Sequence, residues 1–237
     1  MAYIKTIARM ASVIGAGAKK KNRPFTVLIE GNIGCGKTTF LNHFKKYNNV
    51  CVLAEPIDMW RDVNGHNLLD LMYKDTEKWS FPFQSYVQLT MLKMHTMETE
   101  HPIKLMERSV YSARYCFIEK MTRDGKMAAP ACAVLNEYFK WITSTIDIPV
   151  DLIVYLRSSP EVVYNRMMYR NRSEEKCVPI EYIKDLHKYH EDWLYNRTAF
   201  SLPAPVITLN ADLDISVIRE EYEKFEPCIL NRVAANA

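Results

Sequence analysis

The sequence predicts an α/β fold in which a five-stranded parallel sheet is flanked by helices. Five short runs, rich in apolar and β-branched residues, are separated by longer stretches with helical character. Short, nearly continuous apolar strands that alternate with helices are typical of a parallel sheet buried on both faces. The length of 237 residues suits one such domain, and 48% hydrophobic residues are enough to fill its core.

Each element can be placed along the chain from its residue pattern. The expected strands cover residues 25–30, 50–55, 103–108, 151–156 and 205–210. The expected helices cover residues 37–47, 82–98, 109–122, 131–146, 160–170, 179–197 and 215–225. Residues 172–177 are polar and charged, so we expect an exposed, mobile loop there. These elements make up a single domain over 24–230, followed by a short tail at 231–237.

Basic residues are concentrated at the start of the chain. Residues 1–23 hold six of the 31 lysines and arginines and no acid, which leaves 25 basic and 28 acidic residues for the remainder. A mildly acidic body argues against nucleic-acid binding, which needs a basic face. We expect the leader to be disordered. The leader is also compatible with a weak mitochondrial targeting signal, and Lys19–Arg23 is compatible with a nuclear one. The expected compartment is therefore intracellular: cytoplasmic or mitochondrial, with the nucleus left open.

Neither membrane insertion nor zinc binding is predicted. No run reaches the roughly 20 apolar residues that a membrane-spanning helix needs. The six cysteines form no C-x-x-C pair and have no accompanying histidine cluster. We interpret them as reduced thiols of an intracellular protein.

A phosphate-binding loop follows the first expected strand. The pattern G-x-x-x-x-G-K-[ST] is matched by Gly31, Asn32, Ile33, Gly34, Cys35, Gly36, Lys37 and Thr38, and Thr39 continues into the helical stretch. This strand–loop–helix context makes a chance glycine-rich turn the weaker interpretation. Glycines let backbone N–H groups converge on phosphate oxygens, and the helix N-terminus adds partial positive charge. Lys37 is expected to reach the β- and γ-phosphates of a nucleoside triphosphate, and Thr38 to ligate Mg²⁺.

Acidic residues end the second and third expected strands. In open α/β sheets, chemistry takes place at the carboxyl ends of the strands. Glu55 precedes a proline, which keeps it extended, and its carboxylate could accept the proton of an attacking hydroxyl. Glu107 could hold Mg²⁺, and Arg108 could orient Glu55. Taken alone, Glu55 is better interpreted as a surface acid at a turn, whereas Glu107-Arg108 is equally well interpreted as a structural ion pair.

Several segments occur together in the order and spacing of one protein family. They are Gly31–Thr39, Glu55-Pro56 with Trp60, Pro82–Tyr86, Glu107–Ser109 with Ser112–Tyr115, and Arg170–Glu175. In these segments the chain resembles the deoxyribonucleoside kinases over about residues 24–213, closest to the branch that holds the broad-specificity insect enzyme and the mitochondrial thymidine kinase. The resemblance implies a phosphate-loop kinase fold with a mobile lid at about 166–177 and a homodimer. It also implies transfer of the γ-phosphate of ATP, with Mg²⁺, to the 5′-hydroxyl of a deoxyribonucleoside.

The resemblance implies roles for the residues around the reacting atoms. Glu55 matches the general base for the 5′-hydroxyl, Arg108 the arginine beside that hydroxyl, and Glu107 a metal-associated acid. The lid arginines that close over the phosphates are matched by Arg166, Arg170 and Arg172. Cys35 stands where the family usually has serine. The position acts through its backbone N–H, and we hypothesise that alkylation of the thiol impairs ATP binding.

A second set of residues matches the nucleoside pocket of the family. Gln84 matches the residue whose amide makes paired hydrogen bonds to the base, and Tyr73 and Glu175 match the pair that holds the 3′-hydroxyl. The pocket walls are matched by Trp60, Phe83 and Phe117, and the positions that select the base by Val87, Met91 and Ala113. These last three resemble the apolar, small set of the pyrimidine-preferring branch of the family. The resemblance therefore implies that thymidine and deoxycytidine are preferred, with purine deoxynucleosides accepted more weakly.

Two rival functions also use a phosphate loop. A thymidylate-type nucleoside monophosphate kinase would need a cationic site for the acceptor's phosphate near Glu55, where only Arg61 and Arg108 are basic. A GTP-dependent switch would need an N-K-x-D motif, which this sequence does not contain. The monophosphate kinase stays open as the alternative.

Overall fold

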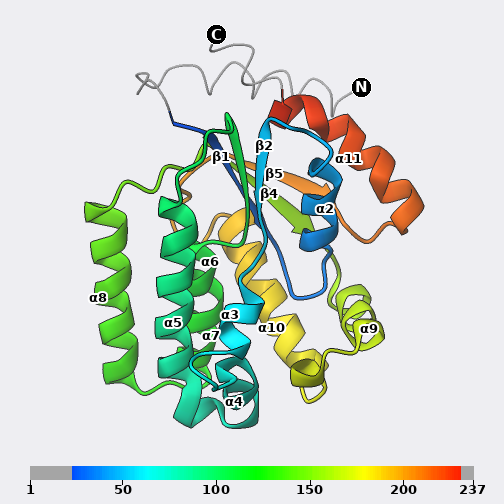
Figure 1. The fold of residues 1–237 in the computed structure, drawn as a ribbon. Coiled ribbons are helices and arrows are strands. Elements are labelled where there is room, and N and C mark those ends of the chain that lie inside the picture. Colours follow the sequence, from blue (N-terminus) through cyan, green and yellow to red (C-terminus); the bar gives the residue numbers. More distant parts are fainter. Residues whose placement is uncertain (1–22, 231–237) are drawn as a thin grey trace.

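Five parallel strands form one sheet in the computed structural model, which describes residues 23–230 (Figure 1). The strands are β1 (Phe25–Glu30), β2 (Val50–Leu53), β3 (Ile103–Glu107), β4 (Leu152–Arg157) and β5 (Val206–Asn210). Their order across the sheet is β2-β3-β1-β4-β5, and every pairing is parallel. The predicted fold class and all five predicted strands are therefore confirmed. The expectations for the leader (1–22) and the tail (231–237) lie outside the described residues.

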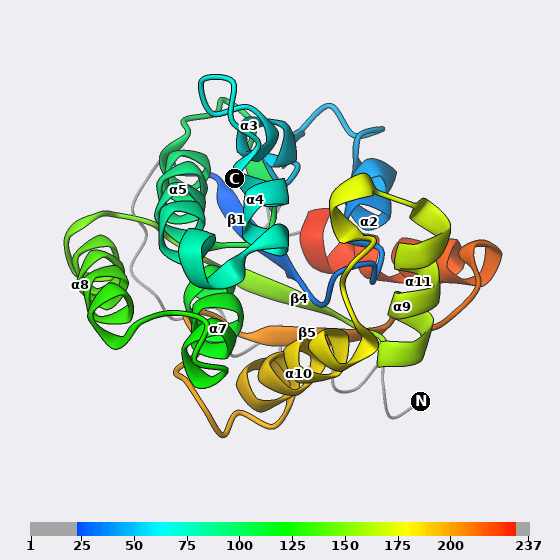
Figure 2. The same ribbon diagram turned by 90° about the horizontal axis from the view of Figure 1, so that it is seen from below.

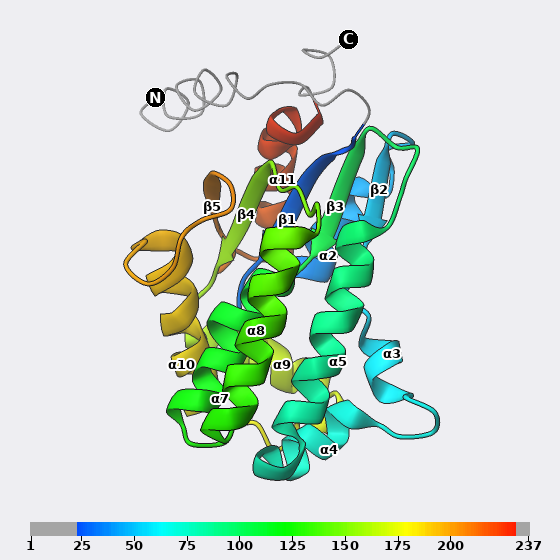
Figure 3. The same ribbon diagram turned by 90° about the vertical axis from the view of Figure 1, so that its left-hand side faces the viewer.

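Helices cover both faces of the sheet. Their bounds are α2 (Lys37–Phe44), α3 (Ile57–Arg61), α4 (Leu68–Lys74), α5 (Thr76–Thr96), α6 (Val110–Ser112), α7 (Glu119–Arg123), α8 (Ala129–Thr145), α9 (Pro160–Arg170), α10 (Ile180–His190) and α11 (Ile215–Leu230). Shorter helical segments join them. Of these, η1 (Ala113–Ile118) and η3 (Glu191–Tyr195) are π-helical, and η2 (Ser173–Glu175) is a single 3-10 turn. Figures 1 and 3 show α2 and α11 on one face of the sheet, and α5 and α8 side by side on the other.

Two helices that the sequence did not predict, α3 and α4, precede the long α5. Helix α5 itself begins at Thr76 rather than at Pro82, because Asp75 caps it by accepting a hydrogen bond from the backbone N–H of Lys78. Asn67 caps α4 in the same way, through the N–H of Asp70. Both capping residues are of types that favour helix starts, whereas Pro82 lies within the helix and does not mark its beginning.

Strand order brings three functional segments to one edge of the sheet. Because β2, β3 and β1 are neighbours, their carboxyl ends lie side by side. Ile29 of β1 pairs in register with Glu107 of β3, and Leu53 of β2 pairs with Met106. The phosphate loop after β1 and the acids after β2 and at the end of β3 must therefore converge. Figure 2, which looks at this edge, shows α3, α4, α9 and α10 around it.

Candidate active site

The phosphate loop takes its shape from backbone conformations that glycine adopts most readily. Gly31, Gly34 and Gly36 have φ angles of 143°, 80° and 99°. A Cβ at Gly34 would lie 2.7 Å from the carbonyl oxygen of Val163, so α9 packs directly against the loop. Helix α2 begins at Lys37 without a side-chain cap, which leaves its first N–H groups for an anion.

Side chains of the loop serve partly to hold it in place. The Asn32 amide donates to the carbonyl oxygen of Ile183 in α10 (2.9 Å), and its own oxygen accepts from the N–H of Ile33 (2.9 Å). The Lys37 ammonium donates to the carbonyl oxygen of Asn32 (2.8 Å). The Cys35 thiol is fully buried, so an alkylating reagent reaches it only when the loop opens. Cys35 also lines the α11 cavity described below, and the sensitivity to alkylation stays a prediction.

Two cavities meet at the phosphate loop. The α5 cavity, named for the helix that contributes Phe83, Gln84, Val87 and Met91 to its wall, has a volume of about 250 Å³. The α11 cavity lies on the opposite side of the loop and encloses about 440 Å³. The residues that line both are Gly34, Lys37, Thr38, Glu107, Arg170 and Arg172. Two molecules bound in the two cavities would therefore meet at a lysine, a hydroxyl, a carboxylate and two arginines.

Almost every predicted site residue lines one of these cavities. The α5 cavity alone holds Ile33, Glu55, Trp60, Tyr73, Phe83, Gln84, Val87, Met91, Arg108, Ala113, Phe117 and Glu175. The α11 cavity alone holds Cys35, Gly36, Thr39 and Arg166. Gly31 and Asn32 line neither cavity: the first shapes the loop and the second ties it to α10.

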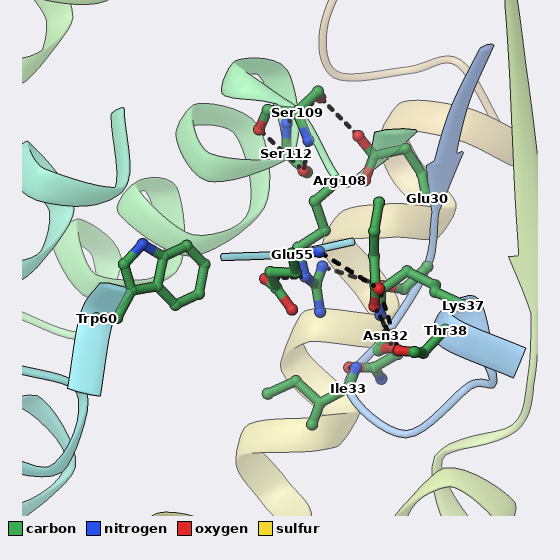
Figure 4. A network of polar contacts seen from close by, with 12 residues as sticks. Glu30, Asn32, Ile33, Lys37, Thr38, Glu55, Trp60, Arg108, Ser109 and Ser112 are labelled. Atoms are coloured by element: carbon green, nitrogen blue, oxygen red, sulfur yellow. Dashed lines mark hydrogen bonds and ion pairs between the residues drawn. The ribbon is translucent and has the colours of Figure 1, made fainter. Parts of the chain in front are cut away.

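Glu55 and Arg108 form an ion pair at the centre of the α5 cavity. The Arg108 Nε atom lies 2.8 Å from Glu55 Oε1, and both side chains are largely buried. Figure 4 shows Glu55 between Trp60 and the phosphate loop. Burial raises the pKa of the Glu55 carboxyl, and the charge of Arg108 opposes that rise. A buried carboxylate beside a fixed cation is suited to accept a proton from a hydroxyl in the cavity.

Arg108 is held in an unusual backbone conformation. Its φ is 63°, in the left-handed region that non-glycine residues seldom adopt. Its Nη1 donates to the carbonyl oxygen of Gly31 (3.1 Å), and its guanidinium lies 4.7 Å from the centre of the Phe117 ring. The next residue, Ser109, caps α6 and donates to the buried carboxylate of Glu30 (2.6 Å). Several independent contacts thus fix this arginine.

Thr38 and Glu107 place oxygen atoms where a metal ion would meet a triphosphate. The Thr38 hydroxyl lies 3.1 and 3.0 Å from the two oxygens of Glu107. Both residues line the two cavities, next to Lys37. Hydroxyl and carboxylate oxygens are the ligands that Mg²⁺ prefers in proteins, so these residues fit the predicted ion.

The far wall of the α5 cavity is flat and apolar, with one polar group. The indole N–H of Trp60 donates to Thr90 (2.9 Å), and its ring meets that of Phe83 edge-on at 5.6 Å. Gln84 is buried, and its Nε2 makes only a long contact of 3.8 Å to the sulfur of Met121. Its Oε1 has no hydrogen-bond partner within residues 23–230. An unpaired buried amide in an aromatic cavity calls for a planar ligand with donor and acceptor groups.

The expectation of an exposed loop at 172–177 is wrong for its two acids. Glu174 and Glu175 form the turn η2 and are buried. Arg170 donates to both oxygens of Glu175 (2.8 and 2.7 Å), and Arg172 donates to one of them (3.3 Å). Ion pairing offsets the cost of burying these carboxylates, which a count of polar residues does not reveal.

Sequence patterns missed two groups of cavity residues. The α5 cavity is also lined by Ala54, Ile57, Asp58, Arg61, Leu69, Met72, Ser109 and Tyr182, and the α11 cavity by Leu213, Asp214, Ile218 and Tyr222. The second group follows the carboxyl end of β5, so the rule that located Glu55 would have found its first members. Arg166 holds this segment through the carbonyl oxygens of Ala211 (2.6 Å) and Leu213 (3.0 Å).

These features define a phosphate-loop kinase with a separate acceptor cavity. Residues 27–233 match the family described as deoxynucleoside kinase, and the chain belongs to that family. It is 45% identical over 212 residues to human mitochondrial thymidine kinase 2, covering 90% of this chain and 80% of the relative. It is 36% identical over 227 residues to deoxycytidine kinase 1 of Xenopus laevis, covering 83% and 86%.

Family membership settles the type of reaction. The protein is an enzyme that phosphorylates deoxynucleosides, with ATP as the phosphate donor. The nucleoside monophosphate kinase alternative is not favoured. Across residues 23–230, no helix is long and apolar enough to cross a membrane.

Proposed function

We propose that the enzyme transfers the γ-phosphate of ATP to the 5′-hydroxyl of thymidine and deoxycytidine, and more slowly to purine deoxynucleosides, for nucleotide salvage. The observation that carries this proposal is Gln84, a buried amide with an unpaired oxygen in an aromatic cavity that also holds Glu55. The apolar or small side chains of Val87, Met91 and Ala113 support the preference for pyrimidines. One relative is called a thymidine kinase and others deoxycytidine kinases, in agreement with this range.

Each catalytic role follows from position in the cavities. Glu55 accepts the proton of the 5′-hydroxyl, while Arg108 fixes the carboxylate and adds positive charge. Lys37 and the lid arginines Arg166, Arg170 and Arg172 line the α11 cavity, where they balance charge on the phosphates. Thr38 and Glu107 would hold Mg²⁺, which neutralises phosphate charge when bound.

The remaining roles concern the nucleoside. Gln84 reads the base, and Phe83, Phe117 and Trp60, which line the same cavity, form aromatic walls around it. Tyr73 and Glu175 hold the 3′-hydroxyl, and both line the same cavity. Residues 166–177 act as the lid of a single domain over 24–230, and closure excludes water that would compete as acceptor.

The proposal is tested by a panel of acceptors with the purified enzyme. ATP- and Mg²⁺-dependent turnover is measured with thymidine, deoxycytidine, deoxyadenosine, deoxyguanosine and thymidine monophosphate. Faster turnover of the two pyrimidine nucleosides is expected. Equal or faster turnover of the purines would contradict the pocket argument, and turnover of the monophosphate alone would contradict the assignment of Glu55.

We also propose a homodimer built on α5 and α8. These helices pack against each other and carry the exposed apolar side chains Leu89, Val134, Tyr138 and Trp141. Burial of such a patch against a second copy removes it from water. Light scattering after gel filtration should give twice the chain mass, and Trp141→Glu should give monomers. A monomeric wild-type protein would refute the dimer.

For the compartment we propose the mitochondrion or the cytoplasm, with a basic leader as the address. The support is the acid-free segment 1–23 and the word mitochondrial in the name of one relative. Fluorescent fusions of the full chain and of a chain without residues 1–23 would separate the compartments. Identical distributions would remove the leader from this role.

A further inference from the structure

The lid turn η2 is tied to the acceptor side of the site by one side chain. Glu174 is 5% exposed and accepts two hydrogen bonds from Arg61 of α3, Nε to Oε1 at 2.8 Å and Nη2 to Oε2 at 3.1 Å. Asn67, the cap of α4, adds a longer bond of 3.4 Å. This paired geometry fixes direction as well as distance. The hydrogen bonds with Arg61 lower the pKa of Glu174 to about 2.

The neighbouring acid, Glu175, has different partners from those of Glu174. Glu175 accepts hydrogen bonds from Arg170 and Arg172, which line both cavities, and Glu175 itself lines the α5 cavity. Two consecutive carboxylates thus bond in different ways: Glu174 ties the turn to α3 and to the cap of α4, whereas Glu175 pairs with the lid's own arginines. The Glu174 side chain is the part of the turn that bonds to Arg61 of α3 and to the cap of α4.

We propose that Arg61 and Glu174 are positioning residues for phosphoryl transfer: their ion pair latches the lid onto α3 and thereby places Glu175 in the wall of the acceptor cavity. The latch rests on the role proposed above for Glu175, which holds the 3′-hydroxyl with Tyr73. Neither Arg61 nor Glu174 needs to touch the reacting atoms. They act by fixing the direction in which the adjacent Glu175 carboxylate points.

Loss of the latch should free the lid turn. Without Arg61, the Glu174 carboxylate keeps the long amide bond from Asn67 and the bond from the Ser173 hydroxyl (3.1 Å), and is left nearly buried without a compensating cation. An unpaired carboxylate has a lower free energy in water than in the protein interior. For Glu174 to reach water, the turn η2 has to move away from α3. Glu175 then leaves the cavity wall, and water gains access to the phosphates.

The test compares Arg61→Gln and Glu174→Gln with the wild-type enzyme on thymidine and 3′-deoxythymidine. Each variant should raise the KM for thymidine about tenfold, the usual scale for loss of a charge-assisted pair. Because the loss acts through the 3′-hydroxyl, KM for 3′-deoxythymidine should change far less. The double variant should be no worse than either single variant, since the two residues act as one unit.

Two further measurements separate positioning from stability. The variants should hydrolyse ATP faster in the absence of nucleoside, relative to their transfer rate, because the lid no longer excludes water. Arg23→Gln is the matched control: Arg23 makes two bonds to Asp151 (2.6 and 2.8 Å), beside the start of β1 and far along the sheet from the site. This control should leave both the KM ratio and the uncoupled hydrolysis unchanged.

The outcomes are distinguishable. Equal losses on both nucleosides, together with unchanged uncoupled hydrolysis, would show a merely structural pair and overturn the proposal. Unchanged KM values in both variants would overturn it as well. If the wild-type enzyme itself treats thymidine and 3′-deoxythymidine alike, the role of Glu175 fails and the latch with it, while thymidine turnover still stands as the test of the proposed function.

Discussion

The phosphate loop and the lid approach the same phosphates but are held by different forces. The loop is fixed by left-handed glycines, a buried Cys35 and direct packing of α9 against Gly34. The lid turn η2 is held by ion pairs between charged side chains, several of them partly exposed. Closely packed groups have a single stable arrangement, whereas partly exposed ion pairs can exchange partners at a small cost in free energy. From this comparison we predict a fixed loop and a movable lid, and the experiments below test that difference.

The largest expected effect comes from breaking the packed region. In Gly34→Ala the new Cβ would lie 2.7 Å from the carbonyl oxygen of Val163, and φ would remain at 80°. Because the loop cannot keep its shape, kcat/KM should fall by about 10³-fold or more, as when preorganised donors to a developing charge are lost. Steady-state kinetics and calorimetric ATP binding check this. Wild-type ATP affinity in the variant would show that the loop is not rigid.

The next largest effect is expected for Glu55, the proposed general base, which lines the α5 cavity beside the loop and the lid. Glu55→Gln keeps the shape of the side chain but removes its ability to accept a proton. We expect kcat to fall by about a hundredfold or more, with a smaller change in the KM for ATP. Single-turnover kinetics separate chemistry from product release. An unchanged kcat would remove Glu55 from the role of base.

A pH-dependent prediction tests the packing under the loop. Burial raises the pKa of Glu30 from 4.5 to about 7, and Ser109 donates to its carboxylate. The folded state therefore favours the protonated carboxyl. The stability of the wild-type protein relative to Glu30→Gln should fall by about 3 kcal/mol as the pH rises through the range from 4.5 to 7, and level off above that range.

Denaturant titrations of both proteins at several pH values check this difference. Gln retains an acceptor for the Ser109 hydroxyl, so other titrating groups cancel in the comparison. A difference in stability that does not vary with pH would show that folding leaves the pKa of Glu30 at its ordinary value.

The smallest effect is expected for the exchangeable contacts of the lid. Arg170→Gln removes two bonds to Glu175 and one cation from both cavities. Because Arg172 remains, the KM for ATP should rise only about tenfold, a cost within the range for one charged hydrogen bond. High salt should weaken ATP binding of the wild type more than that of the variant. A loss as large as that of Gly34→Ala would place the lid among the rigid parts.

Local sequence patterns predicted most of the residues that are proposed to bind or react. The glycine–lysine–threonine signature, the acids at the strand ends and the five strands all depend on neighbours in sequence, and each lies where the patterns predict it. The helices α3 and α4 escape prediction because each is short, so neither shows a helical period of useful length. Of the cavity residues after β5, Leu213 and Asp214 come within reach of the strand-end rule, whereas no motif or strand end marks Ile218 and Tyr222.

The sequence by itself determined the fold class, the phosphate loop and the convergence of Glu55, Glu107 and Arg108, because strand patterns and strand ends are local properties. Only the tertiary structure decided which side chains close the site. Arg61 meets Glu174 across 113 positions of sequence, and Asn32 meets Ile183 across 151. Such pairs form because folding brings distant segments together and leaves buried polar groups to find partners, which no local pattern encodes.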